Sequence, residues 1–144
     1  RTQQEDDMNN DNDVAPLNPD ERSARPGRDA DIARLAGRYR GRNRAVAFDR
    51  LVFSVATAQD TSAGVGGQTE QTLAALERNL IDAGSEKRNI LSATVYITDI
   101  EKKAEMDAVW DAWIGTDHWP QRACVQAALA GDTLVEITCI AARD

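Results

Sequence analysis

Two charged side chains lie inside strand-like stretches near the end of the chain, and they are the strongest candidates for chemistry. Arg122 and Glu136 stand in RACVQAAL and VEITCIAA, two runs with the period of two that is typical of β-strands. Arginine stays charged and offers a planar fork of donors that fits a carboxylate. Because a buried charge needs a partner, the pattern indicates either an Arg122–Glu136 ion pair or a site where Arg122 binds an acidic ligand.

The segment between the two runs predicts how they pair. Residues 130–132, Ala-Gly-Asp, have turn chemistry, so we expect the runs to form an antiparallel hairpin. Alternation places Cys124 on the same strand face as Arg122. Both cysteines, Cys124 and Cys139, are expected to be reduced thiols, because their spacing is neither a metal nor a redox motif.

The preceding residues predict further strands and two helices. A short strand begins near Ile32, and residues 45–48 and 51–56 read as a hairpin. Residues 57–67 read as a connecting loop, since they lack the phosphate-binding motif GxxxxGK[ST]. Residues 91–98 alternate as a half-buried strand, with Leu91 on the apolar side.

Helical periodicity marks the remaining elements. Leucines spaced by three and four residues form one apolar stripe, and Gly84 is expected to end that helix. Thr98 and Glu101 read as a capping box that opens the second helix. The two stripes consist of Leu73, Leu76 and Leu80, and of Met106, Val109, Trp110 and Trp113.

The order of elements predicts an α+β fold, a single sheet with both helices on one face. The other face then needs a cover, and because no helix is left, we expect a subunit interface there.

Composition separates an acidic tail, expected to be disordered or loosely attached, at residues 1–30 from a domain at residues 31–144. The net charge is −7, and residues 1–31 hold nine acidic side chains against four arginines, so −2 remains for residues 32–144. That near-neutral balance argues against nucleic acid as a partner, although arginines cluster between Arg34 and Arg50. We found no apolar run that would span a membrane and expect a cytoplasmic protein.

Common catalytic motifs are missing from the sequence. The chain has one histidine, His118, in a polar loop, and it lacks HExxH, GxSxG and any Cys/His cluster. Zinc hydrolysis and serine-type acyl transfer are therefore disfavoured.

From about Ala33 to Ala142 the chain resembles the RidA/YjgF family of enamine and imine deaminases. The stretches that carry the resemblance are GQTEQTLAALERNLIDAGS (67–85), ILSATVYITDIEKKAEMDAVWDAW (90–113), PQRACVQAAL (120–129) and VEITCIAA (135–142). The pairing of PxRxxV with VEI about a dozen residues later is the most specific of these.

The resemblance implies a chorismate-mutase-like fold, a homotrimer with clefts between subunits, and hydrolysis of 2-imino or enamino acids such as 2-iminopropanoate to 2-keto acids and ammonia. It implies that Arg122 binds the substrate carboxylate and that Glu136 is the catalytic residue, positioning water or relaying a proton. The implied reaction requires no metal or organic cofactor. The implied substrate-binding residues are Arg122, Cys124, Ser54, Arg42 and Asp107.

Three positions depart from the family pattern. Arg42 replaces an aromatic Tyr, Val55 replaces the Gly of a Ser-Gly-Gln run, and Asp107 replaces an Asn of the second helix. Arg42 and Val55 leave open a trimer that binds a small carboxylate metabolite without turnover, and the arginines between Arg34 and Arg50 leave open an activity directed at RNA.

Overall fold

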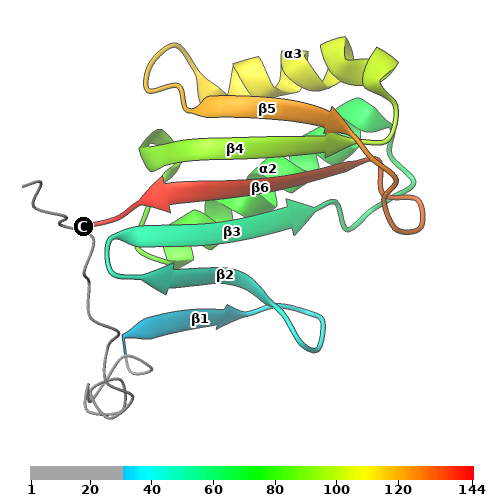
Figure 1. Cartoon of the computed structure of the whole chain (residues 1–144). Coiled ribbons are helices and arrows are strands. Elements are labelled where there is room, and N and C mark those ends of the chain that lie inside the picture. The colour runs from blue at the N-terminus through cyan, green and yellow to red at the C-terminus, as the bar shows by residue number, and fades with distance from the viewer. Residues whose placement is uncertain (1–30) are drawn as a thin grey trace, which may run out of the picture.

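The structure is a computed structural model that describes residues 31–144, and the predicted acidic tail lies outside them. It contains one six-stranded sheet and two α-helices (Figure 1). The elements are β1 (Ile32–Ala36), β2 (Asn43–Phe48), β3 (Leu51–Thr57), α2 (Val65–Asp82), β4 (Ile90–Ile97), α3 (Lys103–Ile114), β5 (Gln121–Gln126) and β6 (Val135–Ala142). Short 3-10 turns at Lys87–Asn89 and Ile100–Lys102 precede β4 and α3.

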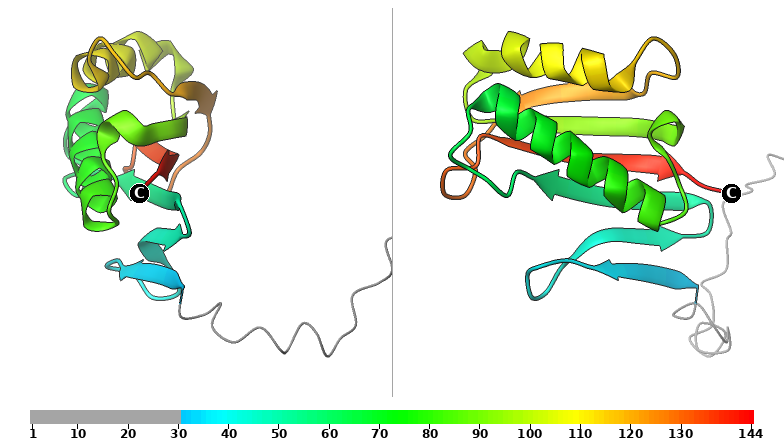
Figure 2. Two further views of the ribbon diagram at one scale, coloured as in Figure 1. Left: turned by 90° about the vertical axis from the view of Figure 1, so that its left-hand side faces the viewer. Right: turned by 180° about the vertical axis from the view of Figure 1, so that it is seen from behind.

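The sheet is mixed, with strand order β1-β2-β3-β6-β4-β5. All neighbours run antiparallel except β4 and β5, which are parallel. Both helices cover the same face, as seen from behind in Figure 2. The predicted α+β class, the single sheet and the placement of the helices are therefore confirmed.

The predicted hairpin of the last two strands is wrong. β5 pairs in parallel with β4, whereas β6 lies between β3 and β4. The chain does turn near Gly131, whose φ is +57°, but the turn belongs to a loop that carries the chain across β4. The pattern β4–α3–β5 is a crossover unit, whose strands must be parallel.

Burial explains why β6 and not β5 is central. In β6 the residues that face the helices are 0–4% exposed, and they are Val135, Ile137, Cys139 and Ala141. No residue of β5 is fully buried. A strand with a completely apolar face gains most from an inner position, and the more polar strand QRACVQ remains at the edge.

The helix stripes are confirmed. Leu73, Leu76 and Leu80 are at most 1% exposed, and Met106 is fully buried. Gly84, with a φ of +83°, follows α2 as predicted, and Ser85 N–H donates to the Leu80 carbonyl at 2.8 Å. Neither helix is long and apolar enough to cross a membrane, so no described residue lies in such a helix.

Three local details differ from the sequence expectations. α2 begins at Val65, so the end of the predicted 57–67 loop is helical. A bulge between Ile90 and Ser92 turns Ile90 inward and leaves Leu91 51% exposed. Asp99, and not Thr98, caps the turn before α3 by accepting from the Glu101 N–H at 3.0 Å.

The sheet face away from the helices, here called the open face, is uncovered in this chain. Its apolar side chains include Phe48, Leu51, Phe53 and Val125, which are 39–44% exposed. So much exposed apolar surface on one side of a sheet is typical of a protein–protein interface.

Candidate functional site

Arg122 lies on the helix-covered face of β5, where α3 passes over it. Its strand partner is Ala93, which is 1% exposed. One guanidinium nitrogen, Nη2, donates to Asp107 Oδ1 at 2.5 Å, and Nη1 lies 3.8 Å from the Met106 sulfur. The guanidinium also stacks over Trp110, with 5.0 Å from Cζ to the ring centroid. These contacts leave the Arg122 side chain only 17% exposed.

Asp107 joins Arg122 to a second cation. Its Oδ2 accepts from Lys103 Nζ at 2.6 Å, one turn earlier on α3. Burial acts to raise the pKa of Asp107, but the hydrogen bonds and charges of Lys103 and Arg122 outweigh it, so the pKa lies below its usual 3.8. The carboxylate is therefore ionised at neutral pH, and the three groups carry a net charge of +1.

Arg122 and Glu136 do not pair, because they point to opposite faces of the sheet. Glu136 lies opposite Tyr96 and Thr57 on the open face, between the buried Val135 and Ile137. The Arg122–Glu136 ion pair that the hairpin suggested is therefore wrong, and Asp107 is the partner instead. One protomer cannot bring both side chains to the same small substrate.

Cys124 shares the helix-covered face with Arg122, as predicted. It lies opposite Val95, and Cys139 lies opposite Ala93 on the other side of β4. Both cysteines are free. Burial raises the pKa of Cys124, and raises that of Cys139 to about 12, so both are neutral thiols at pH 7 and poor nucleophiles.

Ser54 belongs to a different part of the fold. It is 7% exposed, donates to the Arg44 carbonyl at 2.8 Å and accepts from Asn79 Nδ2 at 3.1 Å. Arg44 in turn forms an ion pair with Asp82 at 3.0 Å. Since β6 and β4 separate β3 from β5, Ser54 and Arg122 are not brought together within one protomer.

Arg42 lies in the turn between β1 and β2, also away from β5. Its guanidinium stacks over the ring of Tyr39 at 4.5 Å from the centroid, and Tyr39 is 62% exposed. The arginine cluster is thus divided: Arg44 is held in an ion pair with α2, whereas Arg42 and its neighbours on the turn face solvent. A substrate-binding role for Arg42 and Ser54 stays a prediction.

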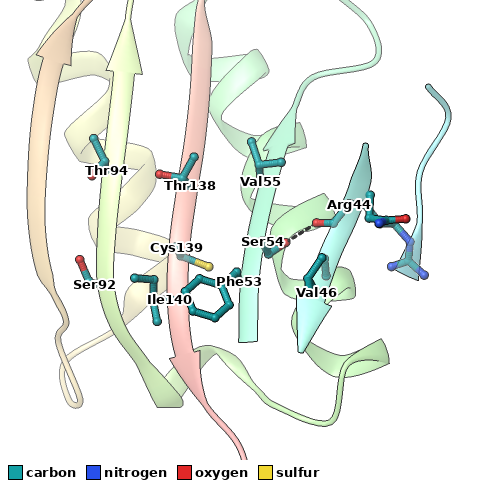
Figure 3. A pocket seen from close by; sticks show the side chains of 12 residues that line it. Arg44, Val46, Phe53, Ser54, Val55, Ser92, Thr94, Thr138, Cys139 and Ile140 are labelled. Carbon is teal, nitrogen blue, oxygen red and sulfur yellow. Dashed lines mark hydrogen bonds between the residues drawn. The ribbon is translucent and has the colours of Figure 1, made fainter. Parts of the chain in front are cut away.

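A pocket of about 360 Å³ lies on the open face (Figure 3). It is formed by residues of β2, β3, β6 and β4, namely Asn43, Arg44, Ala45, Val46, Phe53, Ser54, Val55, Ser92, Thr94, Thr138, Cys139 and Ile140. Neither Arg122 nor Glu136 is among them. Alternation within each strand gives the faces of Thr94 and Thr138, but only the pairing of β4 with β6 brings the two together.

No metal site is apparent in the part of the chain that the structure describes. Within residues 31–144, no three side chains of His, Cys, Asp or Glu gather as metal ligands would. The groups that the fold does bring together are the carboxylate of Asp107, its two cationic partners Arg122 and Lys103, and the thiol of Cys124. Such a set can bind and orient a charged organic molecule.

Comparisons with known proteins find relatives that are similar in sequence over much of this chain. The chain is 35% identical over 98 residues to the RutC family protein YoaB of Escherichia coli, covering 67% of this chain and 86% of that protein. It is 32% identical over 88 residues to the 2-iminobutanoate/2-iminopropanoate deaminase of the same organism, covering 58% of this chain and 68% of that enzyme.

Solved structures give the same result for the fold. A YjgF family member from Neisseria meningitidis superposes with a TM-score of 0.70 at 36% identity, covering 79% of this chain and 96% of that one. A protein from Pseudomonas aeruginosa reaches 0.74 at 30% identity, covering 78% and 99%. The family model described as endoribonuclease L-PSP matches residues 38–143. This chain therefore belongs to the endoribonuclease L-PSP family, that is, the RidA/YjgF family.

Proposed function

We propose that this protein hydrolyses 2-imino and enamino acids, such as 2-iminopropanoate, to 2-keto acids and ammonia. The observation that carries the proposal is the guanidinium of Arg122, held 17% exposed between β5 and α3. A relative named as a 2-iminobutanoate/2-iminopropanoate deaminase supports the choice of substrate.

Arg122 would bind the substrate carboxylate. Asp107 engages one edge of the guanidinium through Nη2, and the group has five N–H donors in all. Donors therefore remain for a second carboxylate, and the aromatic face of Trp110 beneath the guanidinium fixes its plane. A ligand bound there would be oriented with its C=N carbon at a fixed place.

Glu136 would position and activate the attacking water, and this Glu136 would have to belong to a different subunit from Arg122. Arg122 and Glu136 point to opposite faces of one sheet, so a substrate that touches both must lie between two copies of the chain. A homotrimer would bury the open face and create such clefts. The exposed apolar side chains of that face, such as Phe53 and Val125, support this assembly.

The reaction needs few groups. Glu136 accepts a proton from water as the water oxygen attacks the C=N carbon of the protonated imine and the C=N π electrons move to nitrogen, which gives a neutral carbinolamine. The proton on Glu136 then moves to nitrogen, the C–N bond breaks, and ammonia leaves as the hydroxyl proton passes to Glu136 and the C=O bond forms. The thiol of Cys124, on the same face as Arg122, would line the cleft without becoming a nucleophile.

Turnover of an imine generated in place tests the proposal. 2-Iminopropanoate is produced from alanine by an amino-acid oxidase, and its loss is followed by trapping with semicarbazide. We expect wild-type protein to accelerate the loss and Glu136→Gln to lower kcat by about 100-fold, since a general base contributes on that order. KM should change little, because the carboxylate anchor is intact.

Glu101→Gln is the matched control, because Glu101 is an exposed glutamate before α3. It should keep wild-type turnover. A Glu136→Gln protein with wild-type kcat would remove Glu136 from the mechanism. A wild-type protein that leaves the imine at its uncatalysed rate of decay would refute the deaminase proposal.

A second candidate is binding of a small carboxylate without turnover. The ion pair of Arg122 with Asp107 favours it, because Arg122 already has an acidic partner, and Val55 lines the open-face pocket where the family has glycine. Ligand-dependent stabilisation against heating, without loss of imine, would select this candidate.

A further inference from the structure

Three charged side chains form a line from the interior of the site to solvent. Arg122 is 17% exposed, Asp107 28% and Lys103 43%. Each oxygen of the Asp107 carboxylate has one cationic partner, Oδ1 with Arg122 and Oδ2 with Lys103. A carboxylate oxygen can accept more than one hydrogen bond, so Asp107 can still accept from a ligand.

The position of Asp107 changes what Arg122 can bind well. A simple carboxylate ligand meets a guanidinium that already has an anionic partner, and the like charge of Asp107 at the edge of that guanidinium repels it. A ligand that carries a cationic nitrogen next to its carboxylate avoids that repulsion. Its nitrogen can donate to Asp107 while its carboxylate accepts from the remaining donors of Arg122.

We infer that Asp107 and Arg122 together recognise zwitterions of the α-iminium and α-amino acid type. The inference rests on the proposed site at Arg122 and names its substrate class. Adjacent carbon atoms carry the two charges of such a ligand, and the acid and the guanidinium are likewise adjacent, with 2.5 Å between Asp107 Oδ1 and Arg122 Nη2. Asp107 is then the residue that determines specificity, and it discriminates against neutral α-substituents such as hydroxyl.

Binding of unreactive ligands tests this selection. The probes are 2-aminobutanoate, which mimics the zwitterion, and 2-hydroxybutanoate, which has the same carbon skeleton and a neutral substituent. We expect wild-type protein, measured by calorimetry, to bind the amino acid about 10-fold more tightly, since a hydrogen bond to a charged group contributes on that order. Asp107→Asn should lose the preference and bind the hydroxy acid more tightly than wild type does, because the internal carboxylate is gone.

Two control variants separate this role from general charge effects. Asp111→Asn removes an exposed acid one turn further along α3, and Lys103→Gln removes a charge from the same line while leaving the Asp107–Arg122 pair. Both should keep the preference for the amino acid. Circular dichroism of Asp107→Asn is the check on folding, and we expect α3 to be intact because asparagine has nearly the size of aspartate.

The outcomes distinguish this inference from the proposed reaction. A preference that persists in Asp107→Asn, equal binding of both ligands by wild type, or binding of neither would overturn zwitterion recognition, whatever the turnover. A preference that depends on Asp107, found without imine hydrolysis, would refute the deaminase and leave the inference standing.

Discussion

Replacement of Arg122 by alanine is expected to lower kcat/KM for 2-iminopropanoate by about 100- to 1000-fold. Removing one partner of a hydrogen-bonded, largely desolvated charge pair costs about 2–5 kcal/mol, and each 1.4 kcal/mol is a factor of ten. The pair that Arg122 would form with the substrate carboxylate fits that description, because the Arg122 side chain is only 17% exposed. Steady-state kinetics with imine generated in place measures the effect, and most of it should appear in KM.

Arg122→Lys sharpens the interpretation. Lysine keeps the charge but cannot offer the planar fork, so we expect it to recover only part of the loss. Arg88→Ala serves as the matched control, because Arg88 is 59% exposed and forms a surface pair with Glu86. Asp107 retains Lys103 as a partner in the Arg122 variants, so the fold should survive. An Arg122→Ala protein with nearly wild-type kcat/KM would refute the role of carboxylate anchor.

Gln68→Leu is expected to lower the free energy of unfolding by about 4 kcal/mol. Gln68 is fully buried on α2 and holds two loops to the helix with four hydrogen bonds. Its Nε2 donates to the carbonyls of Thr61, Ala63 and Asp132 at 3.0–3.2 Å, and its Oε1 accepts from Leu134 N–H at 2.8 Å. Leucine fills a similar volume but leaves these groups without a partner, and each unsatisfied group costs about 1–3 kcal/mol.

Urea denaturation measures this loss, and Gln71 provides the control. Gln71 lies one turn further along α2 and also binds a loop, through the N–H and carbonyl of Asp60, but at an exposed site. Water can replace those bonds, so Gln71→Leu should cost less than about 1 kcal/mol. Equal losses in the two variants would show that burial of the Gln68 bonds is not what matters. Leu134 precedes β6, so this contact also helps to place Glu136.

Local patterns in the sequence were enough to predict most of the helices and strands. The stripe of Leu73, Leu76 and Leu80 predicted α2, and the turn at Asp49 and Arg50 predicted the β2–β3 hairpin. Both depend on residues that are close in sequence, where periodicity and turn chemistry act directly. The partners of β5 and β6 depend on contacts far along the chain. Nothing within the segment around Gly131 distinguishes a hairpin from a loop that crosses a strand.

The same limit applies to the site. Alternation shows which residues share a face with Arg122 in its strand and with Glu136 in its strand. It does not show whether the two side chains point to the same face of the sheet, because that depends on how the strands pair. Once β6 is placed beside β4, the two side chains point in opposite directions. The Asp107–Arg122 pair likewise requires α3 to pass over β5. Resemblance to a family identified both residues, and the structure adds that they form an ion pair.

The most direct test of the account is whether two inactive variants restore activity to each other. Arg122→Ala and Glu136→Gln chains are co-expressed with different tags, and oligomers that contain both are purified. If a cleft takes Arg122 from one subunit and Glu136 from its neighbour, every trimer that contains both kinds of chain has one complete cleft, about a third of its clefts. The account predicts imine hydrolysis at about a third of the wild-type rate by these mixed trimers, and mixed oligomers no more active than the two parents would contradict it.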